Sequence, residues 1–79
     1  MSPTFLRIGP YRFFFNSREE RRCHVHVSAA GGNAKFWLEP TIALAGYHHL
    51  DAHIVRQIDI LVREHADEIR TAWDKHFNQ

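Results

Sequence analysis

The sequence predicts an α+β fold in which a small antiparallel sheet of about four strands is packed on one face by a long C-terminal helix. Up to Glu39, short runs rich in aromatic and β-branched residues alternate with turn residues, which is typical of strands joined by tight connections. From Asp51 onwards, apolar residues recur at steps of three or four, which is the period of one side of a helix. Because 79 residues suffice for one domain, we expect residues 1–79 to form a single domain.

Four strands are expected in the first half of the chain, over residues 5–8, 11–15, 24–27 and 34–39. The dipeptide Gly9-Pro10 separates the first two strands and favours a tight reversal, and therefore a hairpin. Residues 16–23 are polar and densely charged, which is typical of an exposed loop. Residues 29–33 combine alanine, glycine and asparagine, so they are expected to form the turn before the fourth strand, which Pro40 ends.

The helix is expected over residues 51–77, with Asp51 as its N-cap and no glycine or proline within the apolar stripe. A continuous helix of this length would measure about 40 Å, which is longer than a four-stranded sheet needs. We therefore expect it either to break near His65 or to extend past the sheet towards a partner. The connector over residues 40–50 contains Gly46 and a polar Tyr-His-His run, so a loop with at most one helical turn is expected there.

Alternate residues of a strand point to opposite faces of a sheet, so the residues of the expected strands sort into two sets. The first set is almost wholly apolar and should face the helix: Leu6, Ile8, Tyr11, Phe13, Phe15, Val25, Val27, Ala34, Phe36 and Leu38. The second set gathers cations, histidines and aromatic rings: Phe5, Arg7, Arg12, Phe14, His24, His26, Lys35, Trp37 and Glu39. The second set is therefore where function is expected.

Composition places the chain among ordinary globular proteins, with 44% hydrophobic and 24% charged residues. The longest apolar run, Phe13-Phe14-Phe15, is too short to span a bilayer, and no secretory signal is recognisable, so a cytoplasmic location is expected. The single cysteine, Cys23, excludes an internal disulfide and a four-cysteine zinc site. A domain of this size that has neither a disulfide nor a structural zinc site often gains stability from a partner subunit.

The net charge of +1 conceals a difference between the two halves of the chain. Residues 1–40 hold six basic and three acidic side chains, which gives +3, whereas residues 41–79 hold four basic and six acidic ones, which gives −2. A balance this small does not by itself imply a nucleic-acid partner, although a local basic surface on the first half is compatible with one.

Three interpretations of the second set stay open. Arginine and lysine pair with phosphates while rings stack on bases, which suits single-stranded nucleic acid, and histidine can move protons near neutral pH. Tryptophan and arginine are also favoured anchors where a sheet face is buried against a protein partner. A plain solvated face, with Trp37 half covered by the stems of neighbouring cations, would have the same composition.

The pair His24 and His26 lies on one side of a strand at a spacing that metal sites also use, but zinc needs at least three protein ligands. A third ligand could come from His48, His49 or His53. We expect no metal and no cofactor, because no pair of carboxylates completes the set on the sheet. A nucleophilic dyad of Cys23 and His24 is not expected either, because adjacent strand residues point to opposite faces.

Five segments carry a resemblance to a known family: Pro-Thr-Phe-Leu-Arg-Ile-Gly (3–9), Tyr-Arg-Phe-Phe-Phe (11–15), His-Val-His-Val (24–27), Ala-Lys-Phe-Trp-Leu-Glu-Pro (34–40) and a closing helix with Trp73. The specific feature is the combination of the third and fourth segments. On these residues, essentially the whole chain resembles the small bacterial proteins of the domain of unknown function 4160 family. Members usually have a proline just before the histidine pair, where this sequence has Arg22-Cys23.

The resemblance implies a type II toxin–antitoxin system. Family members typically lie beside a gene for the domain of unknown function 2442 family, and such pairs look like toxin–antitoxin modules. This chain would then be the toxin, neutralised by a small cognate antitoxin that resembles the second family. Many toxins of this size act on translation, often as ribonucleases, so growth inhibition through RNA or the ribosome is expected, with no membrane partner.

In a possible ribonuclease version, the residues of the second set take separate roles. Arg7, Arg12 and Lys35 would hold phosphate and stabilise developing charge, while His24 or His26 moves the proton. Trp37 would stack a base, and Glu39 belongs to the same target-binding face. The alternative function is a non-catalytic protein-interaction module that uses this sheet face and the helix to bind a partner protein.

Overall fold

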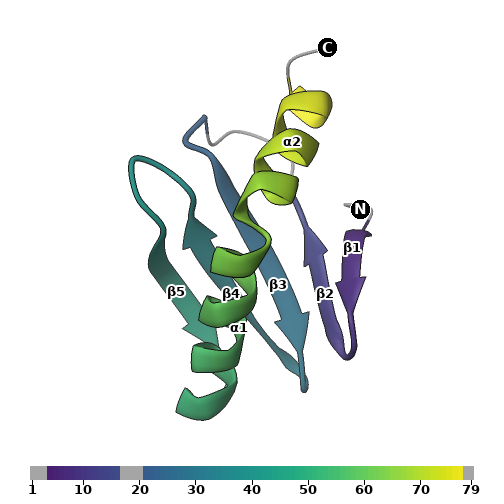
Figure 1. Ribbon diagram of the computed structural model, residues 1–79. Helices are drawn as coiled ribbons and strands as arrows, with labels where there is room; N and C mark the ends of the chain where they lie inside the picture. Colours follow the sequence, from purple (N-terminus) through teal and green to yellow (C-terminus); the bar gives the residue numbers. More distant parts are fainter. Residues whose placement is uncertain (1–3, 17–20, 78–79) are drawn as a thin grey trace.

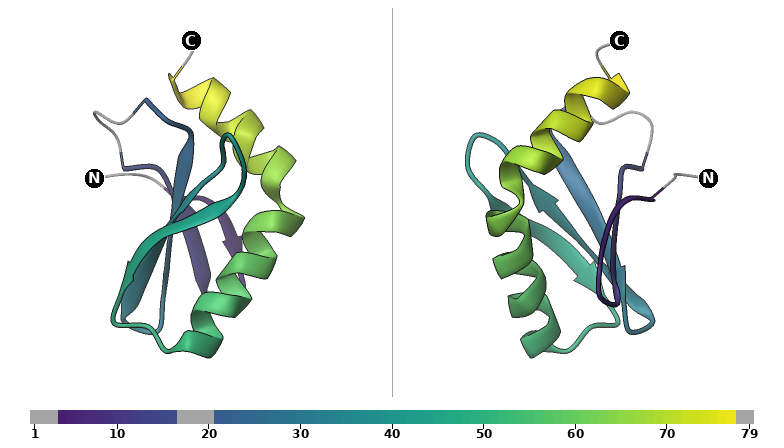
Figure 2. Two further views of the ribbon diagram at one scale, coloured as in Figure 1. Left: turned by 90° about the vertical axis from the view of Figure 1, so that its left-hand side faces the viewer. Right: turned by 45° about the vertical axis from the view of Figure 1, so that its right-hand side comes forward.

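The computed structural model describes residues 4–16 and 21–77 as a sheet with two helices (Figure 1). The elements in chain order are β1 (Thr4–Ile8), β2 (Tyr11–Phe14), β3 (His24–Ala29), β4 (Gly32–Trp37), β5 (Ala43–His48), α1 (Ala52–Glu64) and α2 (Ala66–Phe77). The strands form one antiparallel sheet in the order β1-β2-β3-β4-β5, and both helices lie on one face of it (Figure 2). The expected α+β class and antiparallel sheet are confirmed, with five strands and two consecutive helices.

The expectation of a loop over residues 40–50 is wrong, because β5 occupies most of this segment and pairs with β4. Alanine and glycine are weak strand formers, and an edge strand with little burial on either face needs no alternation of apolar and polar residues. Backbone pairing holds β5 in place instead. At the end of β5 the backbones of β4 and β5 approach so closely that a Cβ on Gly32 would overlap the carbonyl groups of His48 and His49.

The helix expected over residues 51–77 is divided at His65, whose backbone has φ −111° and ψ 20°. The break near His65 that the helix length suggested is therefore confirmed. Asp51 is the N-cap of α1, with extended backbone and no capping hydrogen bond from its side chain. Within the described ranges, neither helix is long and apolar enough to cross a membrane.

The core lies between the sheet and the helices and consists of the first set of strand residues. The strands and the residue after β4 contribute side chains with no exposed surface: Phe13, Val25, Val27, Ala34, Phe36 and, after β4, Leu38. The helices add Ile58, Val62, Ile69 and Trp73, of which Trp73 keeps 8% of its surface exposed. The register pairs Phe13 with Val27 and Val25 with Phe36, so the predicted assignment of these residues to one face is confirmed.

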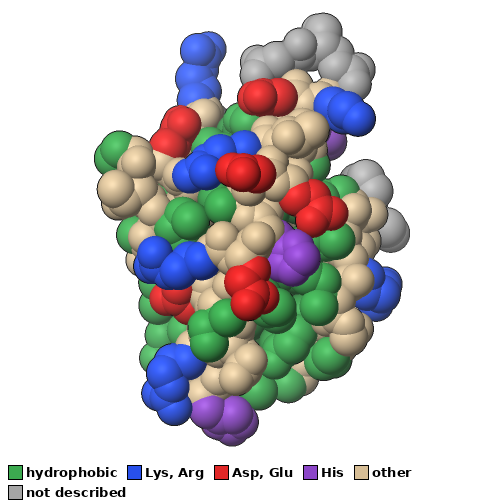
Figure 3. All heavy atoms as spheres, viewed as in Figure 1, with side chains coloured by type: hydrophobic (Ala, Val, Ile, Leu, Met, Phe, Trp, Pro, Cys, Tyr) green, Lys and Arg blue, Asp and Glu red, His purple; other side chains and the backbone are tan. Residues whose placement is uncertain are grey.

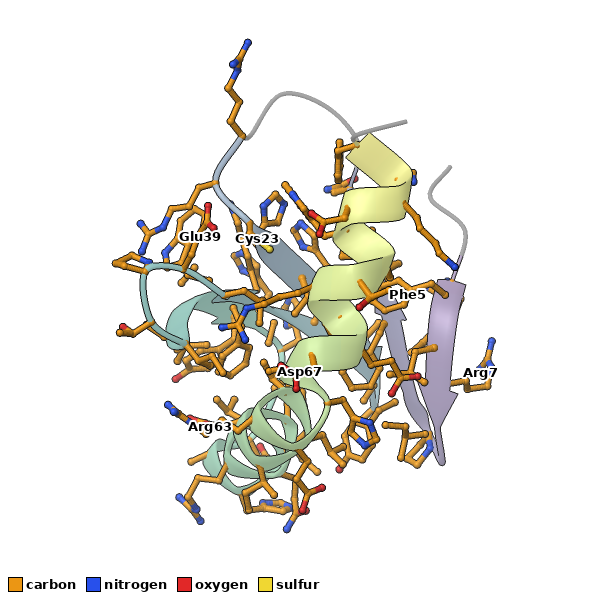
Figure 4. The ribbon with its side chains drawn as sticks, turned by 45° about the horizontal axis from the view of Figure 1, so that its top comes forward. Phe5, Arg7, Cys23, Glu39, Arg63 and Asp67 are labelled. Atoms are coloured by element: carbon orange, nitrogen blue, oxygen red, sulfur yellow. The ribbon has the colours of Figure 1, made fainter. Side chains whose placement is uncertain are left out.

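Phe5 lies on the face opposite to the one expected. The register of β1 on β2 shifts between Thr4 and Leu6, so Phe5 is an extra residue in a bulge. Its ring stacks on Phe15 with centroids 4.4 Å apart, and it lies beside α2 (Figure 4). Its placement with the polar residues is therefore wrong, because the extra residue of a bulge interrupts the alternation of sides, and Phe5 and Leu6 both pack against the core.

Candidate functional site on the polar sheet face

The face of the sheet opposite the helices is organised by the strand register into three cross-strand rows. The middle row, from β1 to β5, is Thr4, Phe14, His26, Lys35 and Gly46. One flanking row is Arg7, Arg12, Ser28, Asn33 and His48, and the other is His24, Trp37 and Ala43. We call these strand residues the polar face; they include three cations and no carboxylate.

A pocket of about 300 Å³ opens on the polar face over β4 and β5. It is lined by His26, Asn33, Lys35, Trp37, Ala45, Gly46 and His48. Gly46 stands directly opposite Lys35 in the register and has no side chain. A Cβ placed on Gly46 meets no atom within 4 Å, so the pocket includes the space that a side chain at this position would fill.

Two cations lie over the ring of Trp37. The guanidinium carbon of Arg22 is 4.1 Å from the ring centroid, and the Nζ atom of Lys35 is 4.3 Å from it. Arg22 is held there because its Nε atom donates a hydrogen bond of 2.8 Å to the carbonyl oxygen of Glu39. Each cation–π contact is worth about 0.5–1 kcal/mol at an exposed site. The Trp37 ring is therefore fixed in position, and a base can stack only on the part that the cations leave accessible.

His26 is partly buried between neighbouring rings. It stacks on Phe14 with centroids 5.4 Å apart and meets the edge of His24 at 5.2 Å. Burial, with smaller contributions from His24 and Lys35, lowers the pKa of His26 from 6.5 to about 4. The imidazole is therefore neutral near neutral pH. In this form it can accept a proton, but it cannot act as a general acid because it is not protonated.

His24 is buried, with 2% of its surface exposed. Its Nδ1 atom donates a hydrogen bond of 2.7 Å to the carbonyl oxygen of Arg22. Its ring lies between Trp37 and Trp73, at centroid distances of 5.9 and 5.0 Å. The two histidines of the predicted pair therefore differ in accessibility: α2 brings Trp73 close to His24, which is buried, whereas His26 is partly exposed.

The other predicted site residues lie around the pocket rather than in it. Arg12 donates hydrogen bonds to Ser28 Oγ at 3.2 Å and to Thr4 Oγ1 at 3.1 Å. Arg7 is exposed and points away from the rest of the sheet (Figure 4). Glu39 follows the end of β4, where its Oε1 atom accepts a hydrogen bond of 3.3 Å from the backbone N–H of Cys23. The pocket thus unites three of the seven predicted residues: His26, Lys35 and Trp37.

Sequence reasoning missed the contributions of Asn33, His48 and Arg22 to this site. Recognising residues 43–48 as a strand would have revealed His48, because strand parity then places its side chain beside Lys35. Asn33 was assigned to a turn, although it lies within β4. Arg22 precedes β3 outside any strand, so no periodic pattern could have shown that it covers Trp37.

Cys23 is a structural residue rather than a nucleophile. It is 6% exposed, and burial together with the charge of Glu39 raises the pKa of its thiol to about 11. The thiol therefore stays protonated at neutral pH. In the part of the chain that the structure describes, no group of three or more His, Cys, Asp or Glu residues could hold a metal ion.

The architecture defines a small α+β domain whose sheet is covered by helices on one face and presents a pocket with cationic and aromatic side chains on the other. Residues 11–74 match the family described as Domain of unknown function (DUF4160), and the chain belongs to this family. The family resemblance carried by the sequence motifs is thereby confirmed. No curated protein and no solved structure matches the chain.

Proposed function

We propose that this chain is the toxin of a toxin–antitoxin pair, and that its polar face binds RNA of the translation machinery in the cytoplasm. The pocket carries the proposal, because it combines the cation of Lys35, the ring of Trp37 and hydrogen-bonding side chains in one place. Phosphate pairing and base stacking are the two interactions that single-stranded RNA offers. The proposed antitoxin is a small protein that resembles the domain of unknown function 2442 family.

The distribution of charge favours an approach of phosphates from this side. Arg7 and Arg12 continue the positive charge along the row beside the pocket. Most carboxylates of the second half lie on the helices: Asp59, Glu64, Asp67, Glu68 and Asp74. They are on the opposite face of the sheet, and charges are screened over about 8 Å at physiological salt, so they oppose binding only weakly.

Binding, rather than cleavage, is the activity that the site chemistry supports best. A ribonuclease needs a base for the 2′-hydroxyl and an acid for the leaving oxygen, each with a pKa near the working pH. His26, with a pKa of about 4, is a weak base and is not an acid at neutral pH. His24 is too buried to reach a substrate. Blocking the target by occupancy is therefore the proposed route to growth inhibition.

The direct test measures fluorescence anisotropy of a labelled single-stranded RNA over a series of salt concentrations. Lys35→Gln and Gly46→Val should each weaken binding about tenfold, the first by removing a phosphate partner and the second by filling the pocket. Lys75→Gln removes the same charge from α2 and serves as the matched control, with affinity close to that of the parent. Equal affinities for all four proteins would overturn RNA binding at the pocket.

The biological test induces the chain alone, and then together with its genomic neighbour, while protein synthesis is followed by pulse labelling. Early loss of translation, reversed by the neighbour, is the expected result. Gly46→Val should abolish the arrest while the protein stays folded, whereas Lys75→Gln should retain it. Arrest that is unchanged by Gly46→Val would remove the pocket from the mechanism.

The non-catalytic interaction module is the second candidate, and one observation favours it. Leu44 and Tyr47 on β5 have 42% and 50% of their surfaces exposed. Large apolar side chains that are exposed on the same strand are typical of a surface that binds another protein. This candidate predicts no growth arrest from folded protein and no RNA binding. The two experiments above therefore separate it from the toxin.

A further inference from the structure

The outer edge of β5 carries no charged side chain of lysine, arginine, aspartate or glutamate and no proline. β5 is the last strand in the order, so within residues 4–16 and 21–77 no strand pairs with its outer side. Natural edge strands are commonly protected by lysine, other inward charges or proline. β5, with the sequence Ala-Leu-Ala-Gly-Tyr-His, has none of these, and its one irregularity is a register shift against β4 that makes Ala45 an extra residue in a bulge. The opposite edge strand, β1, also has a bulge, at Phe5, but differs in carrying the charged residue Arg7.

The helix side of this edge carries exposed apolar side chains from two elements. Leu44 and Tyr47 pair in register with the core residues Phe36 and Ala34, so they point to the helix side. Arg63 of α1 donates a hydrogen bond of 3.3 Å to the carbonyl oxygen of Ile42, just before β5. α1 runs in the opposite direction to β5, and the rise per residue is about 1.5 Å in a helix and about 3.3 Å in a strand. Counted from the contact between Arg63 and Ile42, Ile60 therefore lies about level with Leu44 along the strand direction.

We call the exposed large hydrophobic side chains of β5 and α1 the edge patch: Leu44, Tyr47 and Ile60. Ile60 is 50% exposed, as much as Tyr47. Figure 1 shows α1 in front of β4 with β5 at the edge of the sheet, and Figure 3, from the same viewpoint, shows hydrophobic side chains exposed alongside the charged surface of the helices. A strand added to β5 would cover the edge patch with the side chains on its helix-facing side.

The other side of such a strand would face positive charge. Gly46 lies between Lys35 and the position of an added strand, and it has no side chain to separate them. Strands are about 4.8 Å apart, so an added strand lies about 10 Å from β4, a distance that lysine and glutamate side chains together can span. An acidic side chain on this side would therefore reach Lys35 across Gly46.

We propose that the β5 edge binds an extended segment of a partner protein in which acidic and apolar side chains alternate. A second copy of this chain fits poorly, because an antiparallel pairing of two β5 strands would join two polar faces that hold cations and no carboxylate. The charge of the polar face therefore selects an acidic partner strand over self-association. This inference concerns a different ligand from RNA and holds whether or not the pocket binds RNA.

The test adds a short capped peptide, in which glutamate and valine alternate, to the isotope-labelled protein. Binding is measured by the changes in the NMR chemical shifts of the backbone amides. The largest shifts are expected at Ala43–His48, with new protection of their amides from hydrogen exchange. Tyr47→Lys and Lys35→Gln should each weaken binding about tenfold. His53→Gln, which changes an exposed residue on α1, is the matched control and should leave binding unchanged.

Two control peptides make the outcome decisive. One has lysine in place of glutamate, and the other has the same composition with its glutamates and valines in separate blocks. Both should bind at least about tenfold more weakly. Equal binding of all three peptides, shifts centred on β1, or no shifts would overturn the proposal. Dimerisation of the unbound protein that Tyr47→Lys abolishes would show that a second copy is the occupant instead.

Discussion

Lowering the pH should destabilise this protein through His26 before its carboxylates are protonated. In the unfolded chain His26 titrates near its ordinary pKa of 6.5, whereas in the folded protein its pKa is about 4. Between these values the unfolded chain binds more protons than the folded one, so stability rises with pH. The stability that depends on a neutral His26 is therefore fully present above pH 6.5 and is lost progressively as the pH falls towards 4.

The magnitude follows from the size of this difference. Each unit of pKa corresponds to about 1.4 kcal/mol, so the full difference amounts to about 3 kcal/mol for a fully shielded ring. Because the ring of His26 is only partly buried, solvent screening reduces the expected loss to about 2 kcal/mol. For a domain of this size that is a large share of the free energy of unfolding.

The assay is urea unfolding followed by tryptophan fluorescence at several pH values between neutral and acidic. The parent protein should lose stability over this window, and His26→Gln should lose about 2 kcal/mol less than the parent between neutral pH and pH 4. Gln57→Ala changes an exposed residue on α1 that does not titrate, and it should keep the pH dependence of the parent. The reasoning is refuted if an NMR titration of the native protein places the midpoint of His26 near 6.5, or if the His26→Gln and parent slopes coincide.

Three further predictions concern packing. Gly32→Ala should cost about 1–3 kcal/mol in urea unfolding because its Cβ meets the carbonyls of His48 and His49, whereas Gly46→Ala should change stability by less than about 0.5 kcal/mol; similar effects would contradict the close contact. Cys23 should resist iodoacetamide in the native protein and react once urea is added, and rapid labelling of native protein would contradict its burial. Phe36→Asp should abolish the folded circular dichroism spectrum, because Phe36 has no exposed surface, while Leu44→Asp at an exposed position should leave it intact.

The parts of the fold that the sequence predicts are those in which burial imposes a period. In β2, β3 and β4 one face is packed by helices, so apolar residues such as Val25 and Val27 alternate with polar ones and reveal the register. The position of His65 could be anticipated as a break for a different reason. A single straight helix would be too long for the sheet beneath it.

The parts that could not be predicted lack such a pattern. β5 is mostly exposed on both faces, so backbone pairing alone maintains it, and backbone pairing leaves no trace in side-chain type. The bulge at Phe5 is a local shift of register that an aromatic residue tolerates on either face. His24 has the parity of an exposed residue, and its burial involves Trp73, which α2 places near it, so that burial depends on tertiary structure.

The chain order of the elements has a consequence for synthesis on the ribosome. Every strand pairs with its neighbours in sequence, so hairpins can form as soon as each strand emerges. The helices that cover the apolar face come last, and about 40 residues separate Trp37 from Phe77. At a rate of synthesis of about 5–20 residues per second, the apolar face of the nascent sheet stays exposed for about 2–8 s before the helices are complete. During that interval the nascent chain is a natural client for chaperones that bind exposed hydrophobic surface.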